Sequence, residues 1–262
     1  MLTLYPIKAF QDNYHWLLAD PQTREAAVVD PGDAAPVLAF LEERQLKLTT
    51  VLITHHHADH IGGVATLNER LGPLTIHGPA TPRIPQVNHP VQEGDAITVL
   101  GHRLQVLEVP GHTLEHIAYV SEGPLTAAGP ALFCGDTLFA AGCGRMFEGN
   151  PTMMQGSLQK LADLPTDTLV YCAHEYTLGN LRFAAAVMPD NTALQERQAR
   201  DSALRERGEP TVPSRLATEL ATNPFLRCRE PEVVRMAASV ETLPATDPAS
   251  VFGALRRWKD RF

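Results

Sequence analysis

The sequence predicts a mixed α/β fold followed by a helical domain, and three observations support this prediction. Short runs typical of β-strands alternate with occasional helical patterns from residue 1 to about residue 173. Several of these runs follow one another directly, which favours mixed sheets. From about Thr177 onward the pattern changes to helical segments separated by prolines. We therefore expect an α/β domain over residues 1–173 and a helical domain over residues 174–262.

The strands are expected where short apolar or alternating runs end at turn residues. These runs cover residues 2–7, 16–20, 25–30, 49–54, 74–78, 96–101, 103–110, 117–121, 131–136 and 168–172. Helical spacing is found over Ala34–Arg44, Val64–Leu71 and Thr152–Leu164. Asp33 can cap the first of these helices, and Pro36 lies in its first turn.

Length, composition and charge exclude several classes of protein. With 262 residues, of which 44% are hydrophobic, the chain can bury a sizeable core and slightly exceeds what one core usually holds. Its 22 basic and 30 acidic residues give a net charge of -8, which argues against a nucleic-acid binder. No apolar stretch is long enough to span a bilayer, and the N-terminus resembles no targeting segment. We expect a cytoplasmic monomer that binds neither nucleic acid nor membrane.

The four cysteines are predicted to be free and mostly buried. They do not form the C-x-x-C spacing of a zinc or redox site, and they are too few for a disulfide framework in a chain of this length. Histidine is the more informative residue, since the chain has 11 histidines and three of them are consecutive, at positions 55–57.

The segment Thr54-His55-His56-His57-Ala58-Asp59-His60 follows an apolar strand and precedes Gly62 and Gly63. Residues two apart in an extended chain project to the same side, so His55 and His57 can converge on one cation. Asp59 and His60 can turn toward a second cation, whereas His56 points away and is left unassigned. This density of imidazole and carboxylate groups predicts a metal site.

Three further segments place a histidine or an aspartate at the end of a predicted strand. They are Pro110-Gly111-His112-Thr113, Gly135-Asp136-Thr137 and Ala173-His174-Glu175. Together with the first motif they supply five histidines and two aspartates, which suffice for two metal ions with a bridging carboxylate. Asp30, before Pro31 and Gly32, is interpreted either as support for a ligand or as a plain turn residue.

These motifs, T-H-x-H-x-D-H, P-G-H-T, G-D-T-L-F and H-E-Y-T, resemble the metallo-β-lactamase superfamily. Within it, GDTLFAAGCGRMFEG and CAHEYTLGNLRFA resemble the glyoxalase II family, the hydroxyacylglutathione hydrolases. The similarity runs over essentially the whole chain. It implies an αββα sandwich of two mixed sheets, of the α/β (α+β) class, followed by a helical domain that helps to bind glutathione.

The resemblance also implies a set of ligands. One metal would be held by His55, His57 and His112, and the second by Asp59, His60 and His174, with Asp136 bridging. Two divalent ions per chain are expected, with zinc first and iron or manganese also compatible with nitrogen and oxygen ligands. Asp59 is expected to act in catalysis as well, by accepting a hydrogen bond from the attacking hydroxide.

The glutathione contacts of the family map onto Arg145, Tyr176, Arg256 and Lys259, and Phe147 stands where some members have a tyrosine. These cations would let a chain of net charge -8 bind an anionic tripeptide. Glu115 is a second departure, because the family usually has glycine before the histidine that corresponds to His116. Neither departure alters the assignment of His112.

The expected reaction is hydrolysis of S-lactoylglutathione to lactate and glutathione, the thioesterase step of methylglyoxal detoxification. A thioester suits a metal-hydroxide site because its thiolate leaves without a strong general acid. The alternative within the superfamily is a glutathione persulfide dioxygenase with a single iron. A metal-dependent nuclease fits the net charge poorly, and a non-enzymatic metal-binding protein would be expected to have a closed, thiolate-rich site.

Overall fold

The computed structural model describes all residues from 1 to 262. The chain divides into two compact units, each built from several segments of the sequence. Unit 1 comprises Met1–Glu108, Glu115–Gly135 and Tyr171–His174. Unit 2 comprises Val109–Leu114, Asp136–Val170 and Glu175–Phe262. The division of the sequence into residues 1–173 and 174–262 stays a prediction.

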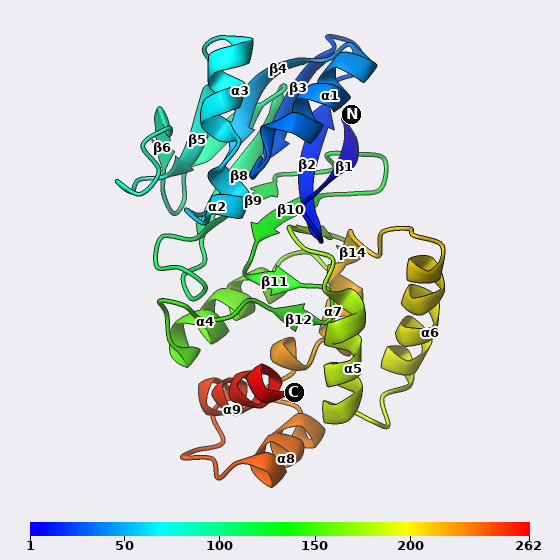
Figure 1. Ribbon diagram of the computed structural model, residues 1–262. Helices are drawn as coiled ribbons and strands as arrows, with labels where there is room; N and C mark the ends of the chain where they lie inside the picture. The colour runs from blue at the N-terminus through cyan, green and yellow to red at the C-terminus, as the bar shows by residue number, and fades with distance from the viewer. The chain divides into compact units, whose positions relative to one another are not determined.

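The first sheet of unit 1 has its strands in sequence order (Figure 1). These strands are β1 (Thr3–Ala9), β2 (Asn13–Ala19), β3 (Glu25–Val29), β4 (Lys47–Leu52), β5 (Thr75–Pro79) and β6 (His89–Val91). The pairs β1–β2 and β2–β3 are antiparallel, whereas β3–β4, β4–β5 and β5–β6 are parallel. Parallel neighbours need a crossover connection, and helices form part of it between β3 and β4 and between β4 and β5. The sheet is therefore mixed, as the sequence predicts.

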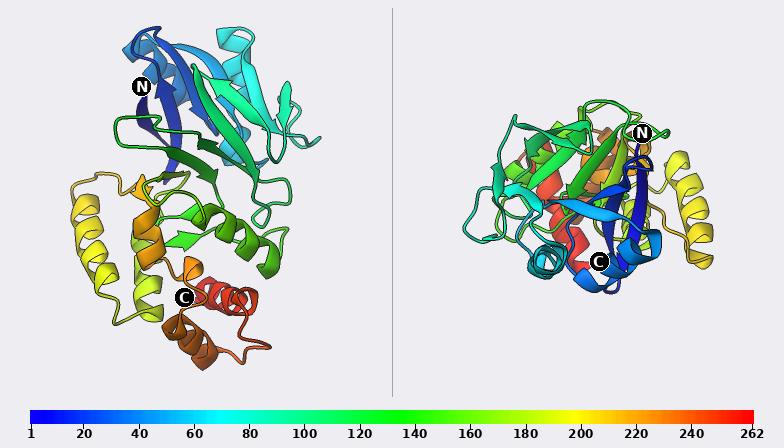
Figure 2. Two further views of the ribbon diagram at one scale, coloured as in Figure 1. Left: turned by 180° about the vertical axis from the view of Figure 1, so that it is seen from behind. Right: turned by 90° about the horizontal axis from the view of Figure 1, so that it is seen from above.

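The crossover helices α1 (Ala34–Arg44) and α3 (Val64–Leu71) pack on the first sheet (Figure 2). Their apolar faces, with Val37 and Leu67 among them, join one buried cluster with Val51 and Ile76 of the sheet. Burial of such side chains contributes about 1.5–3 kcal/mol each. The Asp33 side chain caps α1 by accepting from the amide of Ala35, as predicted. A short helix, α2 (Ala58–Ile61), lies between β4 and α3.

The second sheet has the strand order β14-β13-β10-β9-β8-β7. Its strands are β7 (Ala96–Val99), β8 (His102–Glu108), β9 (Ile117–Ser121), β10 (Ala131–Gly135), β13 (Leu169–Cys172) and β14 (Ser214–Arg215). Within unit 1 it contacts the first sheet, because the Trp16 indole donates to the carbonyl of Cys172 and the Tyr119 hydroxyl donates to the carbonyl of Ile53. The two predicted sheets are thus confirmed.

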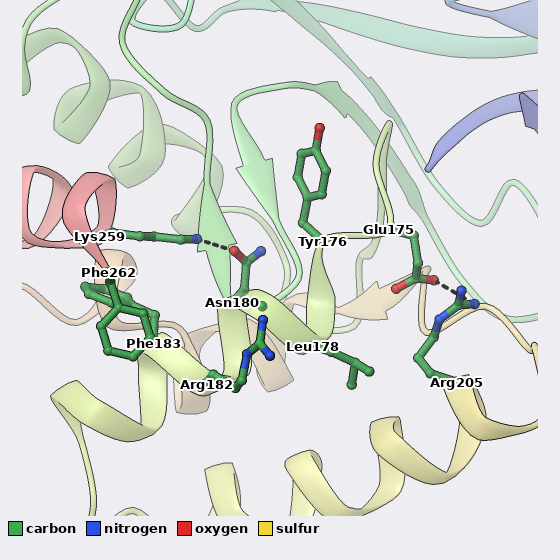
Figure 3. A pocket seen from close by; sticks show the side chains of 10 residues that line it. Glu175, Tyr176, Leu178, Asn180, Arg182, Phe183, Arg205, Lys259 and Phe262 are labelled. Carbon is green, nitrogen blue, oxygen red and sulfur yellow. Dashed lines mark hydrogen bonds and ion pairs between the residues drawn. The ribbon is translucent and has the colours of Figure 1, made fainter. Parts of the chain in front are cut away.

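Unit 2 consists of a small hairpin and most of the helices (Figure 1). Its elements are β11 (Leu138–Phe139), β12 (Gly142–Cys143), α4 (Pro151–Ala162), α5 (Thr177–Val187), α6 (Thr192–Glu206), α7 (Leu216–Thr222), the 3-10 turn Pro224–Leu226, α8 (Pro231–Val240) and α9 (Pro248–Arg261). Prolines begin four of these helical segments, where the missing amide costs no hydrogen bond. Residues of α5, α6 and α9 line a surface pocket of about 610 Å³ (Figure 3).

The predicted helices are confirmed to within two residues at their ends, and all four cysteines are free and buried. The sequence did not indicate α2, β6, β11, β12 or β14. Each has four residues or fewer, which is too short for a periodic pattern. None of the helices combines the length and the apolar character that a membrane span requires.

Candidate metal centre

The histidine-rich segment of unit 1 connects the end of β4 to α2 and α3 and packs closely against the loop after β3. A Cβ atom on Gly32 would lie 1.8 Å from the carbonyl oxygen of Asp59, and one on Gly63 would lie 2.5 Å from that of Pro31. No side chain fits at either position, so the two loops meet backbone to backbone. This contact fixes the start of α2, which carries Asp59 and His60.

Asp59, His60 and His174 form a compact group in unit 1. The Asp59 Oδ2 atom lies 3.5 Å from His60 Nε2 and 3.4 Å from His174 Nε2. Two ligand atoms of one tetrahedral zinc ion, each about 2.05 Å from it, are about 3.3 Å apart. The spacing of these three donor atoms therefore fits a shared divalent cation.

The orientation of both rings gives a stronger argument. His60 Nδ1 lies 3.0 Å from Asp30 Oδ2, and His174 Nδ1 lies 2.8 Å from Asp12 Oδ1. A carboxylate is only an acceptor, so each Nδ1 carries the proton and each neutral ring has a lone pair on Nε2. Both lone pairs face the Asp59 carboxylate, which is itself an acceptor. Such an arrangement needs positive charge between the groups, which a proton on either Nε2 atom or a shared metal ion can supply.

Asp30 and Asp12 thus hold the two rings, and only one of them was anticipated. Asp30 is buried and accepts from the Thr54 amide at 2.7 Å and from the Thr54 hydroxyl at 2.6 Å. These contacts with Thr54 and with the predicted ligand His60 favour the first of the two interpretations of Asp30. Asp12 had no recognisable pattern around it, because its partner His174 is 162 positions away.

Asp59 is held as an anion. Burial by itself would raise the pKa of its carboxyl group, but His174, His60 and Asn13 lower the pKa well below its usual range through hydrogen bonds and charge. Asn13 Nδ2 donates to Asp59 Oδ2 at 3.0 Å. Asp59 is therefore ionised near neutral pH, where it is too weak a base to take up a proton.

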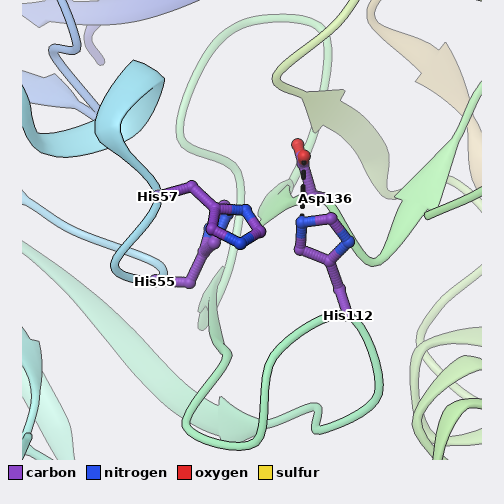
Figure 4. A group of neighbouring side chains, drawn as sticks. All are labelled: His55, His57, His112 and Asp136. Carbon is purple, nitrogen blue, oxygen red and sulfur yellow. Dashed lines mark hydrogen bonds and ion pairs between the residues drawn. The ribbon is translucent and has the colours of Figure 1, made fainter. Parts of the chain in front are cut away.

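His55 and His57 also face each other in unit 1, with 3.0 Å between His55 Nε2 and His57 Nδ1 (Figure 4). The Thr54 hydroxyl lies 3.1 Å from His55 Nδ1 and fixes that ring from its other side. This agrees with the expectation that residues two apart project together. His56 turns instead to Glu115, with which it forms a short contact. Glu115, which stands where the family usually has glycine, is thus the partner of His56.

Unit 2 contains a second pair of this kind, His112 and Asp136 (Figure 4). Their facing atoms, His112 Nε2 and Asp136 Oδ2, are 3.3 Å apart. His112 Nδ1 donates to the carbonyl oxygen of Arg145 at 2.8 Å, so Nε2 again presents a lone pair to a carboxylate. The same argument as for His60 and His174 applies, and the pair fits a cation.

His15 was given no role by the sequence, yet it lies buried behind this region in unit 1. Burial and the nearby His60 lower its pKa to about 4, so its ring is neutral near pH 7. Its Nε2 accepts from the amide of Asp33 at 3.1 Å. His15 therefore helps to fix the loop that carries Asp30.

The predicted substrate contacts all lie in unit 2, in different environments. Lys259 and Tyr176 line the pocket of Figure 3, where Arg182 and Arg205 are further cations and Glu175 is the one carboxylate. Lys259 Nζ donates to the Asn180 side chain in a short hydrogen bond. The pocket is positively charged overall, which suits an anionic ligand in a chain of net charge -8.

The other three predicted contacts differ in exposure. The Arg145 side chain is 68% exposed and the Phe147 side chain 64%, and the Phe147 ring lies 5.2 Å from that of His112. Arg256 is only 3% exposed. Its guanidinium donates to the carbonyl of Cys143 at 3.1 Å and to Asp260 at 2.9 Å. The Arg256 guanidinium is therefore bonded to groups of the protein itself, the Cys143 carbonyl and the Asp260 carboxylate.

Two known families match consecutive parts of the chain, which together cover residues 12–262. Residues 12–174 match the family described as "Metallo-beta-lactamase superfamily", and residues 175–262 match "Hydroxyacylglutathione hydrolase C-terminus". Curated relatives named hydroxyacylglutathione hydrolase include one from Cupriavidus taiwanensis, 55% identical over 100% of both chains. Another, from Nitrosomonas europaea, is 48% identical over 100% of this chain and 97% of its own length.

Solved structures agree on the fold. The crystal structure of ETHE1 from Myxococcus xanthus has a TM-score of 0.64 at 27% identity and covers 99% of this chain and 98% of its own. TTHA1623 in a di-iron-bound form has a TM-score of 0.53 at 29% identity over 65% of this chain and 91% of its own. The BLEG-1 B3 metallo-beta-lactamase, at 22% identity and a TM-score of 0.61, shares the fold over 86% of this chain and 99% of its own.

Proposed function

Because the chain belongs to the hydroxyacylglutathione hydrolase family of the metallo-beta-lactamase superfamily, we propose that it hydrolyses S-lactoylglutathione to lactate and glutathione. The observation that carries the chemistry is the set of imidazole lone pairs that face carboxylate oxygens at His60, His174 and His112. This donor set fits divalent cations. The relatives' names and the cationic pocket support a glutathione thioester as the substrate.

We assign the ligands as the family motifs indicate. His55, His57 and His112 would hold one ion, Asp59, His60 and His174 would hold a second, and Asp136 would serve both. The ligands are all nitrogen and oxygen donors, which suit zinc best here and also accept iron or manganese. A pair of such ions, when bound, lowers the pKa of water to near neutrality and polarises a carbonyl oxygen.

Asp59 orients the attacking oxygen. Its Oδ2 atom is engaged by Asn13 and faces His60 and His174, so Oδ1 is available to accept a hydrogen bond from the nucleophile. The low pKa of Asp59 keeps the carboxylate ionised and makes it a positioning acceptor, not a proton store. Asp30 and Asp12 keep the two Nε2 atoms directed at the same point throughout the reaction.

The leaving group needs little assistance. Addition of hydroxide to the thioester carbon forms a tetrahedral species, and cleavage of its carbon–sulfur bond releases the glutathione thiolate with the bonding electron pair. A thiol of pKa about 8.5 is a good leaving group, and the thiolate takes its proton from solvent. This explains why a site without a dedicated general acid is sufficient.

The glutathione portion is proposed to bind to unit 2. Lys259 and Arg145 supply positive charge, Tyr176 supplies a hydroxyl group, and Phe147 supplies an apolar ring. Tyr176 is two residues after His174, so the chain itself keeps this contact within about 7 Å of a proposed ligand, measured between Cα atoms. Arg256, which is buried, contributes by holding the carbonyl of Cys143 and by its charge.

The test is release of free thiol from S-lactoylglutathione by purified protein, before and after a chelator removes the metal. We expect fast release that disappears with the metal and returns when zinc is added back. A fully metallated sample that releases no thiol would overturn the proposal, and oxygen consumption with glutathione persulfide would then be measured. Size measurement and cell fractionation would check the remaining prediction of a cytoplasmic monomer.

A further inference from the structure

The hairpin of β11 and β12 in unit 2 is buried but pairs only with itself. Residues 138–143 are all buried, and the two strands form a separate sheet with two residue pairs, Leu138 with Cys143 and Phe139 with Gly142. Backbone amide and carbonyl groups in such a position need partners, because water cannot reach them. In this hairpin side chains supply the partners.

Four carbonyl groups in and around the turn accept hydrogen bonds from three buried side chains. The distances lie between 2.9 and 3.2 Å. Each donor comes from a different part of the helical region, namely α5, the end of α7 and α9. The pairs are Asn180 with Ala140, Asn223 with Phe139 and Gly142, and Arg256 with Cys143.

Glu219 of α7 holds the tip of the hairpin. Its Oε2 atom accepts from the amide of Ala141 at 2.8 Å, and Ala141 has the left-handed φ of 55°. Oε2 also accepts from Asn223 Nδ2 at 3.3 Å. Oε1 accepts from Arg197 and from Ser214, both at 2.6 Å. The completely buried carboxylate is thus satisfied by four donors and by one positive charge.

The base of the same hairpin touches the pair His112 and Asp136. Asp136 is two residues before β11, and Arg145, whose carbonyl accepts from His112 Nδ1, is two residues after β12. A Cβ atom on Gly144 would lie 1.9 Å from the Asp136 carbonyl oxygen and 3.2 Å from His112 Nδ1. A displacement of the hairpin therefore moves Asp136 and His112 relative to each other.

We propose that Glu219 is a positioning residue for the metal site: by holding the amide of Ala141 and the Asn223 side chain, it sets the place of the hairpin and hence the spacing of His112 and Asp136. This inference rests on the proposed function, since it takes those two residues as ligands. Glu219 touches neither of them, so its effect passes entirely through the backbone of residues 136–145.

The test compares two variants that disturb the same buried ion cluster. Glu219→Gln keeps the shape of the side chain but replaces one carboxylate oxygen with an amide NH₂ group. That group would face the donors from which the oxygen now accepts. Asp201→Asn is the matched control, because Asp201 is equally buried and also pairs with Arg197, at 3.2 Å, but makes no recorded contact with the hairpin. Zinc affinity is measured by competition with a chromophoric chelator, and amide exchange of residues 138–144 is measured in the metal-free protein.

For Glu219→Gln we expect zinc affinity to fall about tenfold or more, the range seen when a group that orients a ligand is lost. Amide exchange at Ala141 should become faster, and kcat should recover at saturating zinc. Both variants should lower the melting temperature by a similar amount, because each disturbs the same buried ion cluster. The zinc affinity of Asp201→Asn, however, should stay within about twofold of that of the unmodified protein. Unchanged zinc affinity in Glu219→Gln despite faster exchange would overturn the proposal, and so would an equal loss of affinity in both variants.

Asn223→Ser provides a second route if Glu219→Gln does not fold. It removes the donor to Phe139 and Gly142 and the 3.3 Å hydrogen bond to Glu219 Oε2, but it leaves the ion pairs of Arg197 and a capping hydroxyl in place. The same loss of zinc affinity is expected, and an unaltered affinity would contradict the proposal. If the unmodified protein bound no metal, the proposed function would fail together with this inference. If the unmodified protein and Glu219→Gln both bound zinc with the same affinity, only the inference would fail.

Discussion

The loop of residues 54–63 and the segment of residues 136–145 both carry proposed metal ligands, but the two are held by different means. In the loop, ligands are dense in the sequence, and Asp30, directly after β3, holds the His60 ring. In the segment a single aspartate is followed by a hairpin whose backbone is bonded to side chains of distant helices. The first region is thus held by a neighbouring strand end of unit 1, while the second is held by helices of unit 2.

Unit 2 is proposed to contribute both to the metal site and to the substrate site, and hydrogen bonds within it link the residues of the two. Asn180 holds the hairpin through the Ala140 carbonyl and accepts from Lys259, which lines the cationic pocket. Arg256 holds the Cys143 carbonyl from the same helix as Lys259. The side chains that fix the hairpin are therefore neighbours of those proposed to bind glutathione.

The largest effect is expected from Asp136→Ala, which removes the proposed ligand of the second region. Metal content and activity should fall together, with activity lower by about two orders of magnitude or more, because losing a ligand costs more than the 10- to 100-fold loss of a supporting group. Metal analysis and thiol release would be measured on the same samples. Asp167→Ala, an exposed acid in the same unit, serves as the control. Normal metal content with full turnover in Asp136→Ala would remove the bridging role.

A somewhat smaller effect is expected from Asp30→Asn in the first region. The amide can no longer accept from His60 and from both Thr54 donors, so the ring loses its fixed tautomer and zinc affinity should fall by about 10- to 100-fold. Asp33→Asn removes the same charge three residues away and retains the helix cap, so its affinity should be unchanged. Equal affinities in the two variants would show that the loop does not rely on Asp30.

The pH dependence of substrate binding should separate Lys259 from the metal ligands. Burial and the neighbouring Arg256 lower the pKa of Lys259 to about 8, so its side chain is charged below that pH and becomes neutral above it. An anionic substrate needs the charged form, so KM should be nearly constant up to about pH 7, about doubled at pH 8 and about tenfold higher at pH 9. Lys259→Arg should abolish the rise, since guanidinium stays protonated. A rise that persists in Lys259→Arg would assign it to another group.

Lys259→Ala should raise KM more than it lowers kcat, because a charge that binds glutathione acts equally on the substrate and on the transition state. The measurement is a full set of initial rates at pH 7, where the lysine is charged. Arg261→Ala, at the exposed end of the same helix, is the matched control and should leave KM unchanged. If KM were the same in Lys259→Ala and the unmodified protein, the pocket of Figure 3 would not be part of the substrate site.

The smallest effect is expected from Phe147→Tyr beside the second region. The ring is exposed, so the added hydroxyl costs nothing in packing and can restore one hydrogen bond to glutathione. A hydrogen bond is worth about 0.5–1.5 kcal/mol, so KM should fall about two- to tenfold with kcat unchanged. Phe10→Tyr, an exposed phenylalanine of unit 1, should have no effect. An unchanged KM in Phe147→Tyr would show that position 147 does not contact the substrate.

The sequence by itself determined the local features of this protein. Periodicity and caps located the helices at Ala34–Arg44 and Val64–Leu71, and strand ends located each proposed ligand. The helix predictions are confirmed because hydrophobic patterning and capping act over a few residues. The proposed ligands His55, His57, Asp59 and His60 could be named together because they lie within one short loop.

Tertiary structure alone decided which groups hold those ligands in place. Asp12 and His174 are 162 positions apart, and Glu219 and Ala141 are 78 positions apart, so no spacing along the chain indicates either pair. Arg256 belongs to a terminal cationic cluster in the sequence, yet it is buried against the Cys143 carbonyl. The physical reason is that a buried backbone group or ring nitrogen must find a hydrogen-bond partner, and packing of distant elements determines which side chain supplies it.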